Sequence, residues 1–146
     1  MDNIVIGITY SLFAGLFITL QSVFNTRISD KVGLWETTVI VHVVGLIFGL
    51  LMTIIVGKGS FKDIGQVNKI YLIGGVLGVM IVYSVMMGIT SLGASLSIAI
   101  VVTTQLIFAT IVDSFGLFGS PQIEFNFTKF LGILIMIIGI IIFKSK

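Results

Sequence analysis

Five long apolar stretches, separated by short polar segments, occupy most of the chain. They cover approximately residues 4–27, 34–56, 70–90, 95–115 and 129–143. Each approaches the roughly 20 residues that a helix needs to cross about 30 Å of hydrocarbon, and the fifth is the shortest. Because backbone polar groups in lipid must be satisfied inside the segment, helices are the spans that fit. We therefore predict an all-α integral membrane protein, with five transmembrane helices in a single transmembrane domain over residues 1–146.

The first stretch is expected to be a retained helix rather than a signal peptide. A signal peptide begins with positive charge and has a shorter apolar run. Here the leading charge is Asp2, and no cationic residue precedes Arg27. The helix that starts near residue 4 should therefore remain in the mature protein.

The composition agrees with this assignment and excludes several functions. Of the 146 residues, 57% are hydrophobic and 10% are charged, whereas about a quarter of a soluble domain is charged. With no cysteine and one histidine, a disulfide or thiolate site cannot form and zinc is not expected. The net charge of +2 and the lack of a basic run give no sign of nucleic-acid binding. No nucleophile–base pair or phosphate loop stands out, so we expect neither an enzyme nor a cofactor.

Polar residues inside the spans are the candidates for function. In residues 95–115 and just beyond, Gln105, Ala109, Asp113 and Gly116 follow one another at steps of four, four and three, so they share one helix face. Gln105 lies near the middle of its helix, where an unpaired amide is most costly. Such an amide can both donate and accept. We predict that it either lines a solute cavity or clamps a neighbouring helix.

Asp113 lies near the C-terminal end of the same helix, where the helix dipole disfavours negative charge. It therefore needs a positive partner. Lys129 and Lys58 of the same chain lie on the expected side of the membrane, and so would Arg27 of a second, antiparallel copy. We expect Asp113 and Arg27 to be structural, as a possible tie between two copies.

Two further spans carry candidate ligands. Gln21 and Asn25 are four residues apart and share a face of the first helix. They could line a central cavity or bond a neighbouring helix. His42 in the second helix is a candidate proton site or substrate ligand, and the alternative is a neutral imidazole bonded to a carbonyl or hydroxyl. Glu36, in the first turn of that helix, is expected to cap it or to form an interfacial ion pair.

Glycines indicate where helices approach one another or bend. Gly132 and Gly139 lie close to one stripe of the fifth helix, which fits either a dimer seam or packing within one subunit. Gly74, Gly75 and Gly78 lie in the third helix. We expect these three to allow a change of shape, because no predicted span contains proline.

The cationic residues do not favour either orientation. With five helices, one side of the membrane receives four cations, namely Lys58, Lys62, Lys69 and Lys129. The other side also receives four, namely Arg27, Lys31, Lys144 and Lys146. The positive-inside rule needs an asymmetry, so this tie predicts weak orientation or insertion both ways, although small counts also tie by chance. An antiparallel homodimer of such a chain would supply the inverted repeat on which many transporters depend.

Several short motifs resemble one known family. These are Gln105…Asp113-Ser-Phe-Gly116-Leu followed by Leu131-Gly132…Gly139, Gln21-Ser-Val-Phe-Asn25-Thr-Arg27-Ile28, and Gly74-Gly75…Gly78. In this order they resemble the YdcZ-like inner-membrane exporter family of the drug/metabolite transporter superfamily, which is similar to the small multidrug resistance transporters. The resemblance covers nearly the whole chain. It implies a small exporter assembled as an antiparallel pair, and it implies little about the substrate.

The chain departs from the small multidrug resistance pattern at an important position. Those transporters carry a central glutamate in the first helix, which exchanges protons for a cationic drug. This chain has no acid between Asp2 and Asp30. Proton-coupled cation exchange therefore does not carry over.

The sequence thus predicts a small-solute transporter that works by alternating access as an antiparallel homodimer in the cell membrane. Its predicted substrate ligands are Gln21, Asn25, His42 and Gln105. The alternative is a non-transporting membrane subunit that stabilises a larger complex. A channel would need a continuous polar stripe on several helices, and only short stripes are visible.

Overall fold

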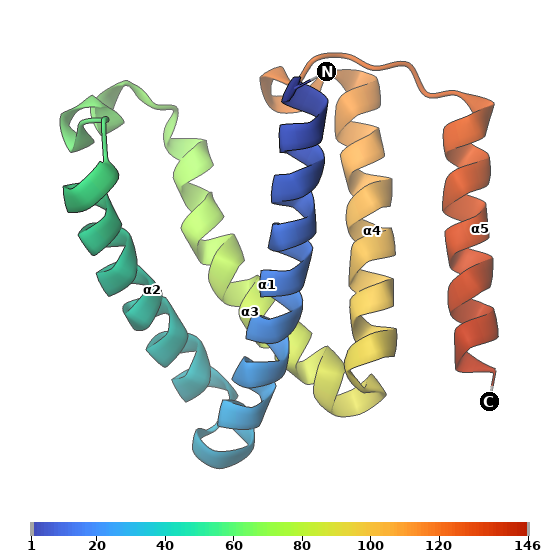
Figure 1. Cartoon of the computed structure of the whole chain (residues 1–146), viewed down its shortest axis with the longest axis horizontal. Helices are drawn as coiled ribbons and strands as arrows, with labels where there is room; N and C mark the ends of the chain where they lie inside the picture. Colours follow the sequence, from blue (N-terminus) through green and yellow to red (C-terminus); the bar gives the residue numbers. More distant parts are fainter. Residues whose placement is uncertain (1, 146) are drawn as a thin grey trace. The chain divides into compact units, whose positions relative to one another are not determined.

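The chain folds into long α-helices joined by short connections (Figure 1). The structure is a computed structural model that describes the backbone of residues 2–145 and the side chains of residues 4–145. The helices in this part are α1 (Asp2–Val32), α2 (Leu34–Val56), α3 (Gly74–Leu92), α4 (Ala94–Phe115) and α5 (Phe127–Lys144). Three short 3-10 turns lie at Phe61–Gln66, Lys69–Ile73 and Leu117–Gly119, and the described residues contain no strand. All five helices are long and apolar enough to cross a membrane, which confirms the predicted all-α class with five spans.

The first helix is longer than the sequence predicted. It runs to Val32 instead of ending near residue 27. The charged segment that was expected to form a turn is the last part of the helix, where Arg27 and Asp30 form an exposed ion pair at 3.7 Å. No residue of this segment interrupts the helix, which ends where Gly33 adopts a positive φ.

Single glycines join α1 to α2 and α3 to α4. Gly33 has a φ of +99° and Gly93 has a φ of +78°, a region that residues with a Cβ rarely adopt. Each glycine donates its N–H to the carbonyl four residues before it, and its own carbonyl accepts from the N–H four residues after it. Both helices of each pair therefore keep their terminal backbone groups bonded while the chain reverses direction within one residue.

The chain divides into two compact units, Met1–Met87 and Gly88–Lys146. In the first unit α1 and α2 form a helical hairpin, and α2 contacts α3 through stacked rings of Trp35 and Tyr83, whose centroids are 4.4 Å apart. In the second unit α4 and α5 form an antiparallel pair (Figure 1). The boundary falls inside the continuous helix α3, and the single transmembrane domain stays a prediction.

Buried side chains are mostly small and polar. Among the described residues, seven polar side chains but only two large apolar ones, Met86 and Ile89, are buried. The seven are Ser22, Asn25, Thr26, Thr37, Thr38, Ser97 and Thr103. In lipid there is no hydrophobic force between helices, so small residues that allow close approach take the contact positions. The large apolar side chains are left to face the hydrocarbon.

The buried hydroxyls in the α1–α2 hairpin bond to their own helices. Thr37 Oγ1 donates to the carbonyl of Gly33 at 2.7 Å, and Thr38 Oγ1 donates to that of Leu34 at 2.8 Å. Ser22 and Thr26 in α1 do the same with the carbonyls four residues before them. This local bonding satisfies each hydroxyl without a partner helix. These side chains can therefore serve as small packing residues at low cost.

Gly88 and Ser97 lie close together in the second unit, and a double-mutant cycle tests this contact. A Cβ on Gly88 would lie 2.5 Å from Ser97 Oγ but 3.6 Å from Ser97 Cβ. Gly88→Ala should therefore lower the free energy of unfolding by about 1–3 kcal/mol through overpacking. Adding Ser97→Ala removes the clashing oxygen and should restore most of that loss, which thermal unfolding in detergent measures. Equal losses in the single and the double variant would contradict this contact.

Candidate functional site

A shallow groove of about 290 Å³ lies between α2 and α3 in the first unit. Its lining residues are Trp35, Thr38, Val39, His42, Val43, Leu46 and Val79. Most of these come from one face of α2, where Trp35, Thr38, His42 and Leu46 follow at steps of three, four and four. The polar groups of the lining residues are the imidazole of His42, the hydroxyl of Thr38 and the indole N–H of Trp35.

One hydrogen bond identifies a ring nitrogen of His42 that carries a proton. The Nδ1 atom lies 2.7 Å from the backbone carbonyl oxygen of Thr38, one turn earlier in α2. A carbonyl oxygen can only accept, so Nδ1 must carry the proton and donate it. In the neutral ring Nε2 is then the unprotonated nitrogen, with a free lone pair. The sequence left two hypotheses open for His42, a functional ligand or proton site and an imidazole bonded to a carbonyl or hydroxyl. The structure contains the bond to a carbonyl that the second hypothesis describes.

The free nitrogen of His42 is turned toward α3. A Cβ placed on Gly78 would lie 3.5 Å from Nε2, so this atom lies close to the backbone of α3 at Gly78. No described residue forms a hydrogen bond with Nε2. The exposed surface of the groove is apolar, and Nε2 lies on the side of the imidazole that faces Gly78.

The two amides of α1 differ in their exposure. Asn25 is only 5% exposed, yet its side chain forms no hydrogen bond with a described residue. Gln21, one turn earlier, is exposed. No hydrogen bond joins Gln21, Asn25 and His42 to one another. These three predicted ligands therefore do not form one hydrogen-bonded set in the described chain.

The amide of Gln105 lies in the second unit, on an exposed position of α4. It forms no hydrogen bond with any described residue. Thr103, two residues earlier, is buried, and its hydroxyl also lacks a partner within the described part of the chain. The middle of α4 therefore holds two polar side chains whose hydrogen-bonding capacity is unused.

Asp113 organises the end of α4 through its backbone. Its carbonyl accepts hydrogen bonds from the N–H groups of Gly116 and Ile123, at 3.3 and 2.9 Å. The candidate partner Lys129 instead donates from Nζ to the carbonyl of Glu124 at 2.8 Å. Within the described part of the second unit, the carboxylate of Asp113 forms no ion pair.

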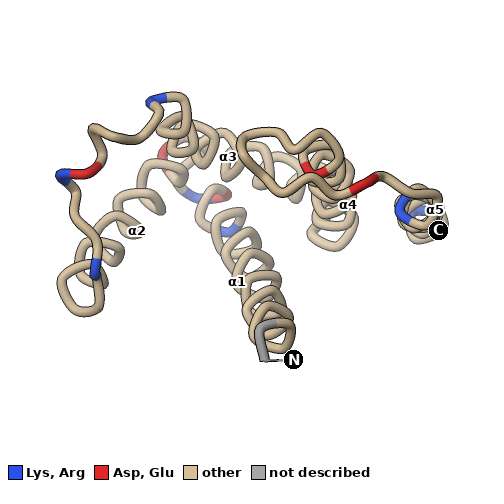
Figure 2. Tube along the Cα trace, turned by 90° about the horizontal axis from the view of Figure 1, so that it is seen from above, with Lys and Arg blue, Asp and Glu red and all other residues tan. Residues whose placement is uncertain are grey.

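The charged residues lie on the connecting segments and toward the helix ends (Figure 2). In the first unit, the carboxylate of Glu36 folds back over Gly33, where a Cβ would clash with it. It is thus placed at the N-terminal end of α2, where the helix dipole favours negative charge. The central turns of the described helices carry no charged residue.

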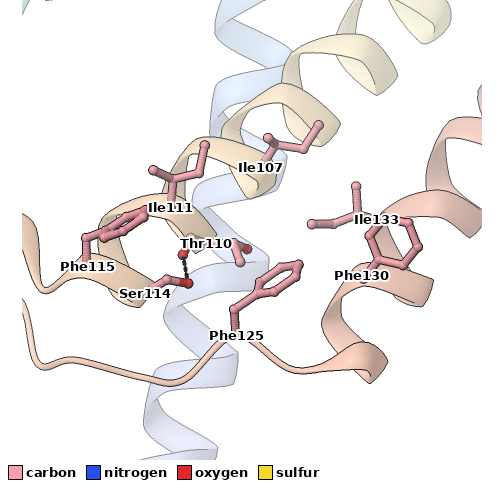
Figure 3. Close-up of a pocket in the computed structure, with 8 residues that line it drawn as sticks. All are labelled: Ile107, Thr110, Ile111, Ser114, Phe115, Phe125, Phe130 and Ile133. Atoms are coloured by element: carbon pink, nitrogen blue, oxygen red, sulfur yellow. Dashed lines mark hydrogen bonds between the residues drawn. The ribbon is translucent and has the colours of Figure 1, made fainter.

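A larger groove of about 430 Å³ lies within the second unit (Figure 3). It is lined by Ile107, Thr110, Ile111, Ser114 and Phe115 of α4, by Phe125 of the connecting loop, and by Phe130 and Ile133 of α5. The hydroxyls of Thr110 and Ser114 donate to the carbonyls one turn before them. This groove is therefore apolar, and its lining contains none of the predicted substrate ligands.

The glycines that were singled out in the sequence have space around them. A Cβ at Gly74, Gly75, Gly132 or Gly139 would meet no described atom within 4 Å. In this single chain none of the four therefore mediates a close helix contact.

Part of the lining of the α2–α3 groove could be predicted from the sequence. The spacing of Trp35, Thr38, His42 and Leu46 places them on one face, which periodicity alone could have revealed. The position of Gly78 opposite Nε2 had no sequence signal, because it depends on how α3 packs against α2. The same holds for the stack of Trp35 on Tyr83.

Five apolar helices and charges confined to helix ends and connecting segments define a multi-pass helical membrane protein. The family described as "Putative inner membrane exporter, YdcZ" matches residues 6–142, and the chain belongs to this family. It is thus a membrane transporter of the exporter kind, located in the inner (cell) membrane, where lipid surrounds it and a small molecule is its substrate. No curated protein and no solved structure matches the chain.

We predict that the amide of Asn25 is not needed for stability. Asn25→Leu replaces a mostly buried side chain, whose amide bonds no described residue, by an apolar side chain of similar size. The free energy of unfolding should stay the same or rise by about 1 kcal/mol, because no hydrogen bond within the described chain is lost and apolar surface is gained. Asn25→Asp, which buries a charge, should be clearly destabilised. Thermal unfolding of both variants in detergent measures this, and a large loss in Asn25→Leu would show that the amide is bonded.

Proposed function

We propose that the chain is a small-solute exporter that works by alternating access as an antiparallel homodimer. The membership of residues 6–142 in the exporter family supports transport. The observation that carries the dimer is the exposure of two amides, Gln21 and Gln105, on helices that cross the lipid. An amide that faces hydrocarbon without a partner is costly. A second copy or a solute in a central cavity would remove this cost.

Charge supports the antiparallel arrangement. The four cations on each side leave no preferred orientation. Asp113 has no ion-pair partner among the described residues of its unit, and Arg27 has only an exposed ion pair with Asp30. Exposed pairs of this kind contribute little. In an antiparallel pair, Arg27 of one copy and Asp113 of the other lie on the same side of the membrane and can form the tie.

The open glycines fit the same proposal. A Cβ on Gly132 or Gly139 of α5 would meet no described atom within 4 Å, so this stripe is available to a second copy. Gly74 and Gly75 at the start of α3 have similar space. Together with Gly78, they would let α3 adopt two shapes that the two copies exchange.

In this mechanism Gln21, Asn25, His42 and Gln105 contact the solute in a cavity near the middle of the membrane. The absence of an acid between Asp2 and Asp30 removes the carboxylate on which cation–proton exchange would depend. Transport would then be facilitated diffusion or be coupled through His42 or a peripheral carboxylate. The alternative function, a non-transporting subunit of a larger complex, would use the same exposed amides to bind a different membrane protein.

The antiparallel pair can be tested by crosslinking, because the chain has no native cysteine. Copies carrying Arg27→Cys and copies carrying Asp113→Cys are co-expressed with different tags. We expect a crosslinked heterodimer, since the two positions would share one side of the membrane. The control pairs Arg27→Cys with Ser145→Cys, two positions that share a side only in a parallel pair. Crosslinking of the control but not of the test pair would exclude the antiparallel arrangement.

Transport can be tested by flux of a panel of small neutral and charged solutes in liposomes containing the purified protein. We expect saturable flux of at least one solute. Gln105→Leu should lower this flux about tenfold, the effect of losing a hydrogen bond in a water-poor site, whereas the neighbouring Leu106→Ile should not. If no solute moves and the protein instead co-purifies with a second membrane protein, the subunit function is favoured.

A further inference from the structure

The connection between α2 and α3 combines cations with exposed apolar side chains. It contains the two 3-10 turns Phe61–Gln66 and Lys69–Ile73, and it lies within the first unit. We propose that this connection binds anionic phospholipids of the surrounding bilayer. Its lysines would contact the lipid phosphates, and its apolar side chains would enter the boundary between head groups and acyl chains. The inference goes beyond transport, because it holds whether or not the chain moves a solute.

The apolar side chains of the first turn share one edge. In a 3-10 helix, side chains three residues apart eclipse one another, so Phe61 and Ile64 project along the same line. Their exposed fractions are 71% and 55%. The turn is capped by Ser60, whose hydroxyl oxygen accepts from the N–H of Lys62 at 3.2 Å. Large apolar side chains that are exposed beside the end of a spanning helix gain free energy when they leave water for the membrane interface.

The charges of the connection are mainly positive. It carries Lys58, Lys62 and Lys69 against one acid, Asp63, and the cations are spread along the connection (Figure 2). Within the described part of the chain, none of the three lysines forms an ion pair. The carboxylate of Asp63 accepts from the amide of Gln66 at 3.4 Å. Lipid phosphates would give the three ammonium groups the counter-charge that the connection itself lacks.

The connection between α4 and α5 provides a contrast within the same chain. It is also apolar, and Ile123 is 49% exposed, close to the value for Ile64. Its charges are balanced, since residues 116–129 hold Glu124 and Lys129. With five helices that cross the membrane, both connections lie on one side of it in either orientation of the chain. Anionic lipid should therefore collect at the α2–α3 connection and not at the α4–α5 connection.

The chain has no native cysteine, so single bimane labels can report the lipids beside each connection. Ile64→Cys and Ile123→Cys are labelled separately in the full-length protein, which is reconstituted in vesicles of equal parts phosphatidylglycerol and phosphatidylcholine. In one set of vesicles the phosphatidylglycerol carries brominated acyl chains, and in a second set the phosphatidylcholine does. Bromine quenches a nearby fluorophore, so the ratio of the two signals measures which lipid lies beside the label.

We expect phosphatidylglycerol to be enriched beside position 64 by about fivefold, the effect of a single lysine near an anionic surface. High salt should lower this enrichment, because it screens the charges. At position 123 the two brominated lipids should quench equally. Equal quenching at position 64 would overturn the proposal. A lack of quenching by either lipid there would also overturn it, because the connection would then lie in water or against another protein.

Variants of the connection test the cause of this preference. Replacing its three lysines by glutamine should abolish the preference for phosphatidylglycerol at position 64. The control makes the same change in net charge at three cations elsewhere in the chain, namely Lys31, Lys129 and Lys144, and should keep the preference. Phe61→Gln should lower the quenching by both lipids, because the turn loses an apolar anchor. A preference that survives without the three lysines, or that is lost equally in the control, would overturn the proposal.

Discussion

The arrangement of this protein depends on one constraint, which is that polar groups inside a bilayer must find partners within the protein. Between helices in lipid, apolar side chains gain little by leaving one hydrocarbon surface for another. The described structure follows this rule, since its buried residues are mostly threonine, serine and asparagine. Thr37 and Thr38 satisfy their hydroxyls on carbonyls of their own helix. Packing in the α1–α2 hairpin therefore adds few demands on other helices.

The same constraint identifies the polar atoms that remain unused. The hydroxyl of Thr103 is buried and lacks a hydrogen bond within the described chain. Nε2 of His42 and the amide of Asn25 also form no hydrogen bond with a described residue. The amides of Gln21 and Gln105, which are exposed, also form no hydrogen bond with a described residue. In a soluble protein, water would fill this role, but a bilayer interior supplies none. Each of these groups is thus a point at which a second copy or a solute would lower the free energy of the protein.

The sequence was sufficient for the fold class, and it was less informative about the site. Five apolar stretches predicted five helices because a bilayer leaves no other spanning element for such segments. The end of α1 was placed too early, since the charges at Arg27 and Asp30 suggested a turn while only Gly33 has the required conformation. His42 could be selected as a rare polar residue in a span with a carbonyl or hydroxyl as an alternative partner, and the structure identifies a partner in the carbonyl of Thr38. The direction of Nε2 could not be predicted, because it depends on the packing of α3 at Gly78.

The absence of a central acid in α1 and the fixed tautomer of His42 have related consequences. A carboxylate in the membrane selects by charge, and it can exchange a cation for a proton. An imidazole in its neutral form, whose Nδ1 donates to a carbonyl at 2.7 Å, carries no such charge. In a water-poor interior an unmatched donor or acceptor is costly. Selection would then depend on hydrogen bonds rather than on charge. A transporter of this kind needs only a small polar site, and most of its intramembrane surface can remain apolar.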